Sequence, residues 1–184
     1  MEVKKEIFIS VDIEASGPIP GEYSMLSIGA CLVYAPNTKF ECILKPLNWN
    51  ADPEALAVTG FNLQELERSG LEPVQAMTNF DNWVTATCGE DGVPVFVGLN
   101  APFDWSFINY YFHRYYGSNP FGFTALDIKA YYMGVTGSTW KGTRSSAMVS
   151  RLHLEPQKSH NALQDSVHQA EIFRLIRELS LQDN

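Results

Sequence analysis

Cysteine is scarce in this sequence, and long apolar runs are missing. The three cysteines, Cys31, Cys42 and Cys88, are odd in number and none forms a C-x-x-C pair, which excludes a secreted disulfide framework and favours a reducing compartment. The first apolar stretch, at residues 7–9, is soon interrupted by a serine and an aspartate, so it is too short for the core of a signal peptide. No run approaches the roughly 20 apolar residues of a membrane span. We therefore expect a soluble, cytoplasmic protein that does not bind membranes.

Positive charge is also scarce. The chain has 13 Lys and Arg against 21 Asp and Glu, which gives a formal net charge of −8, and this excludes a protein that binds nucleic acid through general basicity. The charge is unevenly distributed, because residues 46–104 hold nine acids and one base, whereas residues 129–158 hold one acid and five bases: Lys129, Lys141, Arg144, Arg151 and Lys158. This basic segment could contact a phosphate backbone or could be a mobile loop without a ligand.

Length and hydrophobic periodicity predict one mixed α/β domain over residues 1–184. A chain of 184 residues with 45% hydrophobic content can bury a core without a disulfide or metal staple. Apolar, β-branched stretches predict strands at residues 6–14, 25–34, 40–44 and 94–99. Helical spacing predicts helices at residues 53–58, 62–69, 73–86, 102–116 and 159–179. Residues 125–131 are expected to form a strand or a strand-to-helix element, and residues 134–144 a polar loop.

Two carboxylates interrupt the apolar pattern of the first predicted strand. Asp12 and Glu14 are two residues apart, so both side chains should project from the same face, while Ile13 points the other way. Buried charges of one sign are costly unless a cation compensates them. Mg²⁺ and Mn²⁺ prefer oxygen ligands and would suit such a pair. For D-x-E alone, however, two charges at a solvated strand end are the simpler interpretation.

Further acids and a histidine occupy the starts of two later helices. Asp104 falls in the first turn after the strand at residues 94–99, where the helix dipole alone would favour an acid. Asp165 lies near the start of the last predicted helix, and His160 precedes it by five residues. A single histidine at such a position is more often a solvated or capping residue than a catalyst. These residues become informative only as a set.

As a set, they resemble the DEDDh family of 3′-to-5′ exonucleases, whose members include ribonuclease T, oligoribonuclease and polymerase proofreading subunits. D-x-E lies on the first strand, N-x-x-F-D-x-x-F follows a later strand, and H-x-x-x-x-D begins the last helix. The segments SIGACLVY and PEALAVTGFNLQEL also resemble the family, so that the similarity covers residues 8–176. The sequence departs from the common pattern in DIEASG, at Leu99 before the asparagine, and at Ser166 after the last aspartate.

The resemblance implies a ribonuclease H-like fold, with a central mixed five-stranded sheet flanked by helices. It also implies two divalent cations, Mg²⁺ or Mn²⁺, about 3.5–4 Å apart. Asp12 would bridge both, Glu14 and Asp165 would complete one site, and Asp104 would support the other. His160 would accept the proton of the attacking water, because an imidazole titrates near neutral pH.

Contacts with the substrate are implied for a further set of residues. Aromatic side chains near Asp104 can stack on bases, although an aromatic stripe on a helix is more often part of the core. By resemblance, two side chains at the start of the second strand would wedge against the terminal base, and the backbone around residues 13–16 would bind the terminal hydroxyl. The expected substrate-binding residues are Ile13, Ala15, Met25, Leu26, Asn100, Phe103 and Phe107.

The expected activity is hydrolysis of single-stranded nucleic acid from its 3′ end, with release of nucleoside 5′-monophosphates. By analogy with single-domain relatives, RNA is slightly favoured over DNA and a homodimer is possible. Two alternatives remain open. One is a catalytically silent nuclease fold that binds nucleic acid or a protein, and the other is an acidic structural domain.

Overall fold

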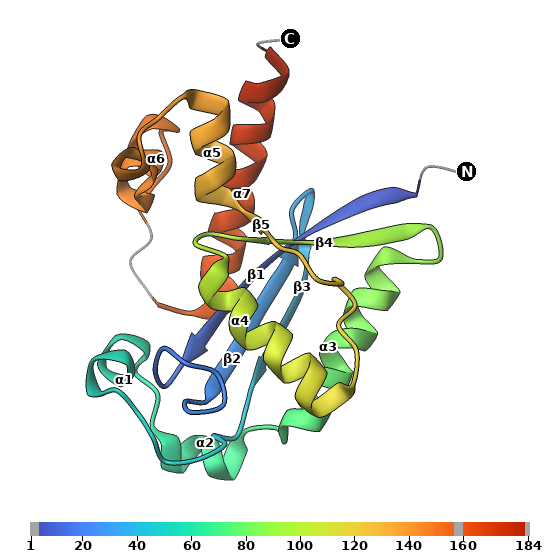
Figure 1. Ribbon diagram of the computed structural model, residues 1–184, viewed down its shortest axis with the longest axis vertical. Coiled ribbons are helices and arrows are strands. Elements are labelled where there is room, and N and C mark those ends of the chain that lie inside the picture. The colour runs from blue at the N-terminus through green and yellow to red at the C-terminus, as the bar shows by residue number, and fades with distance from the viewer. Residues whose placement is uncertain (1–3, 157–159, 183–184) are drawn as a thin grey trace.

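The computed structural model describes residues 4–156 and 160–182. Five strands form one sheet in the order β3-β2-β1-β4-β5 (Figure 1). Their bounds are Lys5–Ala15 (β1), Met25–Leu32 (β2), Ala35–Ile43 (β3), Gly92–Gly98 (β4) and Leu126–Asp127 (β5). β1 pairs antiparallel with β2 and parallel with β4, and β3 and β5 form the edges. The mixed five-stranded sheet expected from the sequence is therefore confirmed.

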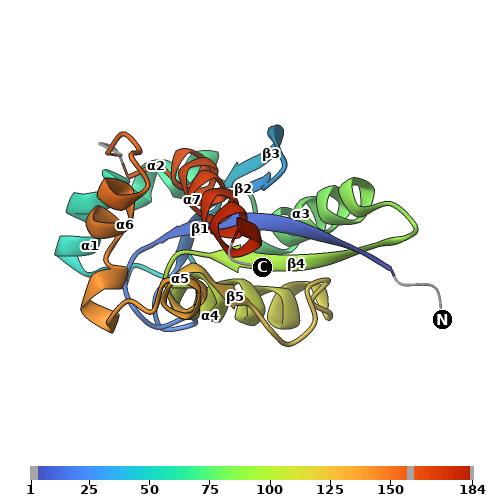
Figure 2. The same cartoon turned by 90° about the horizontal axis from the view of Figure 1, so that it is seen from above.

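Helices cover both faces of this sheet. They are α1 (Pro53–Thr59), α2 (Leu63–Ser69), α3 (Pro73–Cys88), α4 (Pro102–Tyr111), α5 (Ile128–Thr136), α6 (Ser145–Arg151) and α7 (Ala162–Gln182). The cores show that α3 and α4 pack on one face and α5, α6 and α7 on the other, and Figure 2 shows α4 and α7 on opposite sides of the sheet. Among the described residues, no helix is both long and apolar enough to cross a membrane.

The two faces of β1 have different roles. Ile9, Val11 and Ile13 are buried in the core that includes α3 and α4. Because side chains alternate along a strand, Asp12 and Glu14 project from the other face, which α7 covers. The alternation predicted from the sequence therefore places these two carboxylates between the sheet and the last helix.

The structure differs from the expected elements at three places. β3 begins at residue 35 instead of 40, because the edge strand is largely exposed and its polar first half carries no apolar pattern. The segment 134–144 is mostly helical, since α5 runs to Thr136 and a 3-10 helix spans Trp140–Thr143. α6 was not anticipated. Residue 159, where the last helix was expected to begin, lies outside the described residues, and α7 begins at Ala162.

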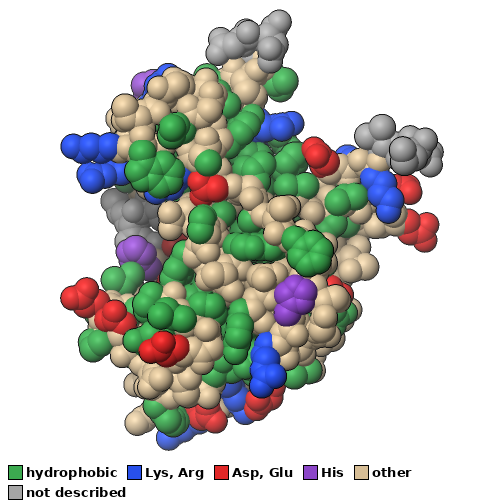
Figure 3. Space-filling view, viewed as in Figure 1, with side chains coloured by type: hydrophobic (Ala, Val, Ile, Leu, Met, Phe, Trp, Pro, Cys, Tyr) green, Lys and Arg blue, Asp and Glu red, His purple; other side chains and the backbone are tan. Residues whose placement is uncertain are grey.

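Charged side chains of opposite sign gather on separate parts of the surface. Figure 3 shows Lys and Arg side chains projecting at the edge formed by α5 and α6, and Asp and Glu side chains gathered near α1. The exposed bases on the first flank are Lys141, Arg144 and Arg151. Glu54 on α1 and Glu65 and Glu67 on α2 are exposed acids. The uneven charge along the sequence is thus also uneven in space.

The start of α7 lies directly against β2 at Gly29. A Cβ atom at Gly29 would come within 2.1 Å of the backbone of both Ala162 and Leu163. Gly29 is the partner of Asp12 in the β1–β2 ladder. This close approach therefore brings the first turns of α7 over the face from which the two β1 carboxylates project.

Replacing Gly29 with alanine should separate α7 from the sheet. We expect Gly29→Ala to destabilise the protein by about 1–3 kcal/mol, because backbone atoms must move to admit the methyl group. Thermal unfolding followed by circular dichroism measures this. Gly134→Ala is the matched control, since a Cβ there meets nothing within 4 Å and alanine favours a helix. A Gly29→Ala variant as stable as the wild type would contradict the inferred packing.

Candidate active site

Three carboxylates from two elements meet between β1 and α7. Asp12 and Glu14 come from β1 and Asp165 from the first turn of α7. Each offers an oxygen atom, and these atoms all lie within 4.8 Å of one another. Two segments about 150 residues apart in the sequence thus form one acidic cluster, as the resemblance implied.

Asp104 is hydrogen-bonded to the same stretch of β1. It is buried in the first turn of α4, and its Oδ1 accepts a hydrogen bond from the backbone N–H of Ile13 at 3.0 Å. Because Ile13 lies between Asp12 and Glu14, this bond places Asp104 beside both of them. The turn that leads into α4 is held by Asp127, whose Oδ2 accepts the Ala101 N–H at 2.8 Å.

Reciprocal hydrogen bonds hold the start of α7. The Asn161 side chain accepts the N–H of Gln164 at 3.0 Å, and Asp165 Oδ2 accepts the N–H of Asn161 at 3.2 Å. Such a pair satisfies N–H groups that a helix start leaves without partners. His160 is exposed and directly precedes this cap. The structure therefore places His160 two residues before the first residue of α7.

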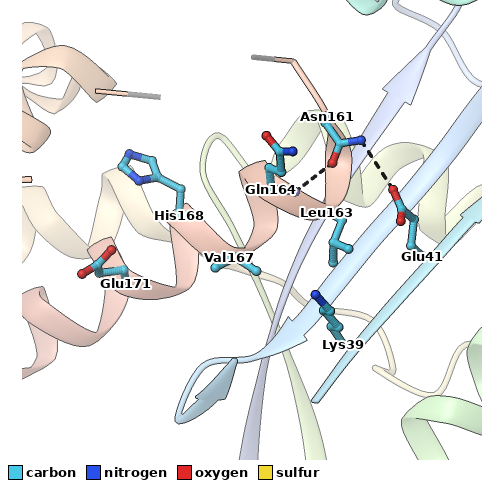
Figure 4. A pocket seen from close by; sticks show the side chains of 8 residues that line it. All are labelled: Lys39, Glu41, Asn161, Leu163, Gln164, Val167, His168 and Glu171. Atoms are coloured by element: carbon cyan, nitrogen blue, oxygen red, sulfur yellow. Dashed lines mark hydrogen bonds between the residues drawn. The ribbon is translucent and has the colours of Figure 1, made fainter. Parts of the chain in front are cut away.

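A cavity of about 590 Å³ lies next to this helix start but is separate from the carboxylate cluster. It is lined by α7 and β3 (Figure 4), and Asn161 Nδ2 donates to Glu41 Oε1 across it at 3.4 Å. Neither the three clustered acids nor Asp104 lines it. The hydrogen bond across the cavity lets the edge strand β3 support the start of α7. We assign the cavity no further role.

Burial and mutual repulsion raise the pKa values of three of these acids, Asp12, Glu14 and Asp104. Burial raises the pKa of Asp12 well above its usual value, and neighbouring carboxylates raise it further. Burial and then the charge of Asp165 raise the pKa of Glu14 from 4.5 to about 7. Burial raises the pKa of Asp104 from 3.8 to about 8, although the Ile13 hydrogen bond favours its charged form. Such clustered shifts are typical of functional sites.

One residue of the site was not anticipated from the sequence. Gln169 on α7 is 4% exposed; its Nε2 donates to Asp12 Oδ1, and its Oε1 accepts the Leu99 N–H at 2.9 Å. It thereby joins α7, β1 and the end of β4 at the position of Asp12. A glutamine four residues after Asp165 lies on the same helix face, and this spacing was the only signal in the sequence.

Three of the seven expected substrate-binding residues are inaccessible. Met25, Leu26 and Phe107 are each 0% exposed. All three belong to hydrophobic clusters, so a base could touch them only if neighbouring side chains moved. Their apolar character reflects packing of the core, and the structure does not place them at a surface for substrate.

The other four expected contacts divide into two pairs. Ile13 and Ala15 are also buried, and the Ile13 N–H, expected to bind substrate, is instead bonded to Asp104. Phe103 is 36% exposed and Asn100 is exposed in a left-handed turn with φ 66°. Of the seven residues, Asn100 and Phe103 are therefore the ones that offer surface next to Asp104.

The donors present fit divalent cations. Carboxylate oxygens are the ligands that Mg²⁺ and Mn²⁺ prefer, and repulsion among the four acids favours a compensating cation. Ser27 is paired with Glu14 in the ladder, so the two side chains share a face. Its buried hydroxyl has no hydrogen-bond partner among the described residues, as expected where a bound group or its water completes the site.

Comparison with known proteins agrees with this geometry. No protein-family model matches the chain. A curated relative, the 3′-5′ DNA exonuclease Cap18 of Escherichia coli, is 54% identical over 180 residues, which cover 98% of this chain and 96% of the relative. The sequence similarity therefore extends over essentially the whole length of both proteins.

Solved structures show the same fold at low identity. The nuclease domain of 3′hExo, a DEDDh family member bound to rAMP, has a TM-score of 0.74 at 15% identity, covering 97% of this chain and 92% of that one. E. coli exonuclease I in complex with a dA16 oligonucleotide has a TM-score of 0.77 at 15% identity, covering 97% of this chain and 42% of that one. With its ribonuclease H-like fold and its close relative, the chain belongs to the DEDDh family of 3′-5′ exonucleases.

Proposed function

We propose that this protein shortens single-stranded DNA from its 3′ end and releases nucleoside 5′-monophosphates. The observation that carries the proposal is the cluster of Asp12, Glu14 and Asp165, with oxygen atoms within 4.8 Å of one another and Asp104 beside it. The choice of DNA rests on the relative with 54% identity, which is a DNA exonuclease. Exonuclease I, with the same fold, is seen with DNA oligonucleotides. The preference for RNA and the homodimer expected from the resemblance find no support in these comparisons.

The proposed site holds two divalent cations, Mg²⁺ or Mn²⁺. When bound, they supply positive charge that neutralises the phosphate and stabilises the leaving 3′ oxygen. Asp12, Glu14 and Asp165 hold them, and Asp104 supports them from its bond to Ile13. His160, exposed just before the start of α7, takes the proton of the attacking water. Gln169 keeps the Asp12 carboxylate oriented through a neutral donor.

Substitution of the metal-supporting residue Asp104, or of the general base His160, should abolish hydrolysis without unfolding the protein. We expect Asp104→Asn and His160→Ala each to lower the rate at least about 100-fold. Asp104→Asn keeps the shape of the side chain and removes a repelled charge, so its melting temperature should not fall. The measurement is Mg²⁺- or Mn²⁺-dependent release of mononucleotides from a labelled oligonucleotide, in DNA and RNA versions, with chelator as the blank.

His113→Ala is the matched control, because His113 is exposed on the π-helix Phe112–Tyr116, nine residues beyond Asp104. Near-wild-type hydrolysis by His160→Ala would remove that residue from the mechanism. A wild-type protein that binds the oligonucleotides but releases no mononucleotide with either metal would favour the catalytically silent alternative.

The raised pKa values predict a dependence of stability on pH that bound metal should flatten. In the folded protein, burial raises the pKa of Glu14 to about 7 and the pKa of Asp104 to about 8, well above the pKa of about 4 of unfolded carboxyls. Between the unfolded and the folded pKa values, the folded state therefore binds more protons than the unfolded state. The free energy of unfolding consequently falls as pH rises from about 5 to 8.

Thermal unfolding in chelator, measured across this range, should show the decline. Bound Mg²⁺ or Mn²⁺ compensates the ionised carboxylates and should flatten it, and Asp104→Asn should make it shallower in chelator. A melting temperature that stays constant in chelator between pH 5 and 8 would contradict the raised pKa values of Glu14 and Asp104.

Loss of Gln169 should weaken metal binding as well as activity. Gln169→Leu retains approximate size but removes both hydrogen bonds, so Asp12 is no longer oriented. We expect Mn²⁺ affinity and hydrolysis to fall about 10- to 100-fold, as for other residues that orient metal ligands. Affinity is measured by electron paramagnetic resonance of free Mn²⁺. Gln75→Leu, an exposed position on α3, is the control, and equal Mn²⁺ affinity in both variants would contradict the assignment.

A further inference from the structure

An exposed tryptophan, a lysine and the turn before Asp104 form a connected group beside the active site. Trp140 is 59% exposed, and the ammonium group of Lys129 lies 4.3 Å from the centre of its ring. Lys129 Nζ also donates to Asn100 Oδ1 at 3.5 Å. We call these three residues the Trp140 cluster. It joins the 3-10 helix Trp140–Thr143, the first turn of α5 and the end of β4.

Hydrogen bonds hold the segment around Trp140 in place. Thr143 Oγ1 donates to the Trp140 carbonyl at 2.8 Å, and Thr139 Oγ1 accepts the Gly142 N–H at 3.4 Å. Just upstream, the hydroxyls of Thr136 and Ser138 lie 2.6 Å apart. Residues 134–144 are thus an ordered platform instead of the loop expected from the sequence. A platform ordered in advance loses less conformational entropy on binding.

The cluster is connected to the catalytic acids through one residue. Asp127 Oδ1 accepts the Ala130 N–H at 2.7 Å and so caps α5, which carries Lys129. Its Oδ2 accepts the Ala101 N–H at 2.8 Å, in the turn that leads to Asp104. The Trp140 cluster and the carboxylate cluster are therefore held at opposite ends of the same short turn, with the exposed ring of Phe103 beside it.

The chemistry of this group suits a nucleotide. Lys129 covers part of the indole, and the remaining exposed surface of Trp140 can stack on a base, as aromatic side chains do in proteins that bind single strands. The ammonium group can pair with a phosphate. Neighbouring Lys141, Arg144 and Arg151 are exposed on the same flank, which is the basic edge in Figure 3. Lys158, expected to extend this flank, lies outside the described residues.

We propose that the Trp140 cluster binds a nucleotide on the 5′ side of the one being removed, with its base on Trp140 and its phosphate on Lys129. The single strand therefore leaves the active site over α5 and α6 and not over α1 and α2. The inference rests on the proposed function, because it presumes a nucleic-acid strand whose 3′ end lies among the carboxylates. The acidic side chains of α1 and α2 repel phosphates on the opposite flank.

That opposite flank offers a matched tryptophan for the test. Trp49 is 62% exposed and belongs to the loop whose Asn50 carbonyl accepts the Ser16 hydroxyl at 2.9 Å, just beyond the end of β1. Tyr34, 56% exposed, lies in the turn between β2 and β3, away from the end of β1 that carries Glu14. Trp140→Ala, Trp49→Ala and Tyr34→Ala therefore probe the two flanks and the far end of the sheet.

Binding is measured by fluorescence anisotropy of a labelled 12-nucleotide DNA, in an Asp104→Asn background with Mg²⁺. We expect Trp140→Ala to weaken binding about 5- to 100-fold, Trp140→Phe to retain most of the affinity, and Trp140→Leu to resemble the alanine variant. Trp49→Ala and Tyr34→Ala should change affinity less than about twofold. Lys129→Gln should lower the slope of log affinity against log salt by about 0.7, the value for one phosphate contact on a single strand.

Hydrolysis by the otherwise wild-type protein separates the inference from the proposed function. The substrates are the same oligonucleotide and the p-nitrophenyl ester of thymidine 5′-monophosphate, which has no further nucleotide. Trp140→Ala should lower the ratio of kcat/KM for the oligonucleotide to that for the ester at least about fivefold. An unchanged ratio and affinity, or a loss of affinity in Trp49→Ala instead, overturns the inference. Absence of metal-dependent hydrolysis of both substrates by the wild type overturns the proposed function.

Discussion

The arrangement of the active site depends on the contact between the start of α7 and the backbone of β2 at Gly29. Because a Cβ at Gly29 would lie 2.1 Å from the backbone of α7, only glycine permits this approach without movement of the backbone. Gly29 is the partner of Asp12 in the ladder, so the helix comes to rest over the face that carries the acids of β1. Asp165 and Gln169 reach that face because both are on this helix, one turn apart.

Packing of this kind brings like charges together, and neutral donors orient three of the four carboxylates. Gln169 donates to Asp12, the Ile13 N–H to Asp104 and the Asn161 N–H to Asp165. All three are neutral donors, so they fix the direction of these carboxylates without adding positive charge. Arginine or lysine partners would have lowered the pKa values and removed the electrostatic demand for metal. The raised pKa values are thus a consequence of the same design that makes cation binding favourable.

Local rules predicted where each acid lies on its own strand or helix, whereas the grouping of the acids into one site was implied by the resemblance to the DEDDh family. Period-two alternation puts Asp12 and Glu14 on one face, and the helix starts put Asp104 and Asp165 near strand ends. Gln169 could not be assigned in this way, since its role depends on a contact with a residue 157 positions away in the sequence. Apolar side chains are equally suited to a core and to a base, so Met25, Leu26 and Phe107 were expected at the substrate and lie in the interior.

The same limit applies to residues 134–144. Their composition predicts a loop, but their threonine and serine hydroxyls form short-range hydrogen bonds that order the segment.

The order of this segment gives the net charge of −8 a different meaning from the one that composition alone suggests. A generally basic surface would hold a strand along its whole length through phosphate contacts, which would oppose its advance after each cleavage. On the proposed function, an acidic protein with a basic, aromatic flank would attract the strand only where its end must be presented, which is what stepwise removal of nucleotides requires.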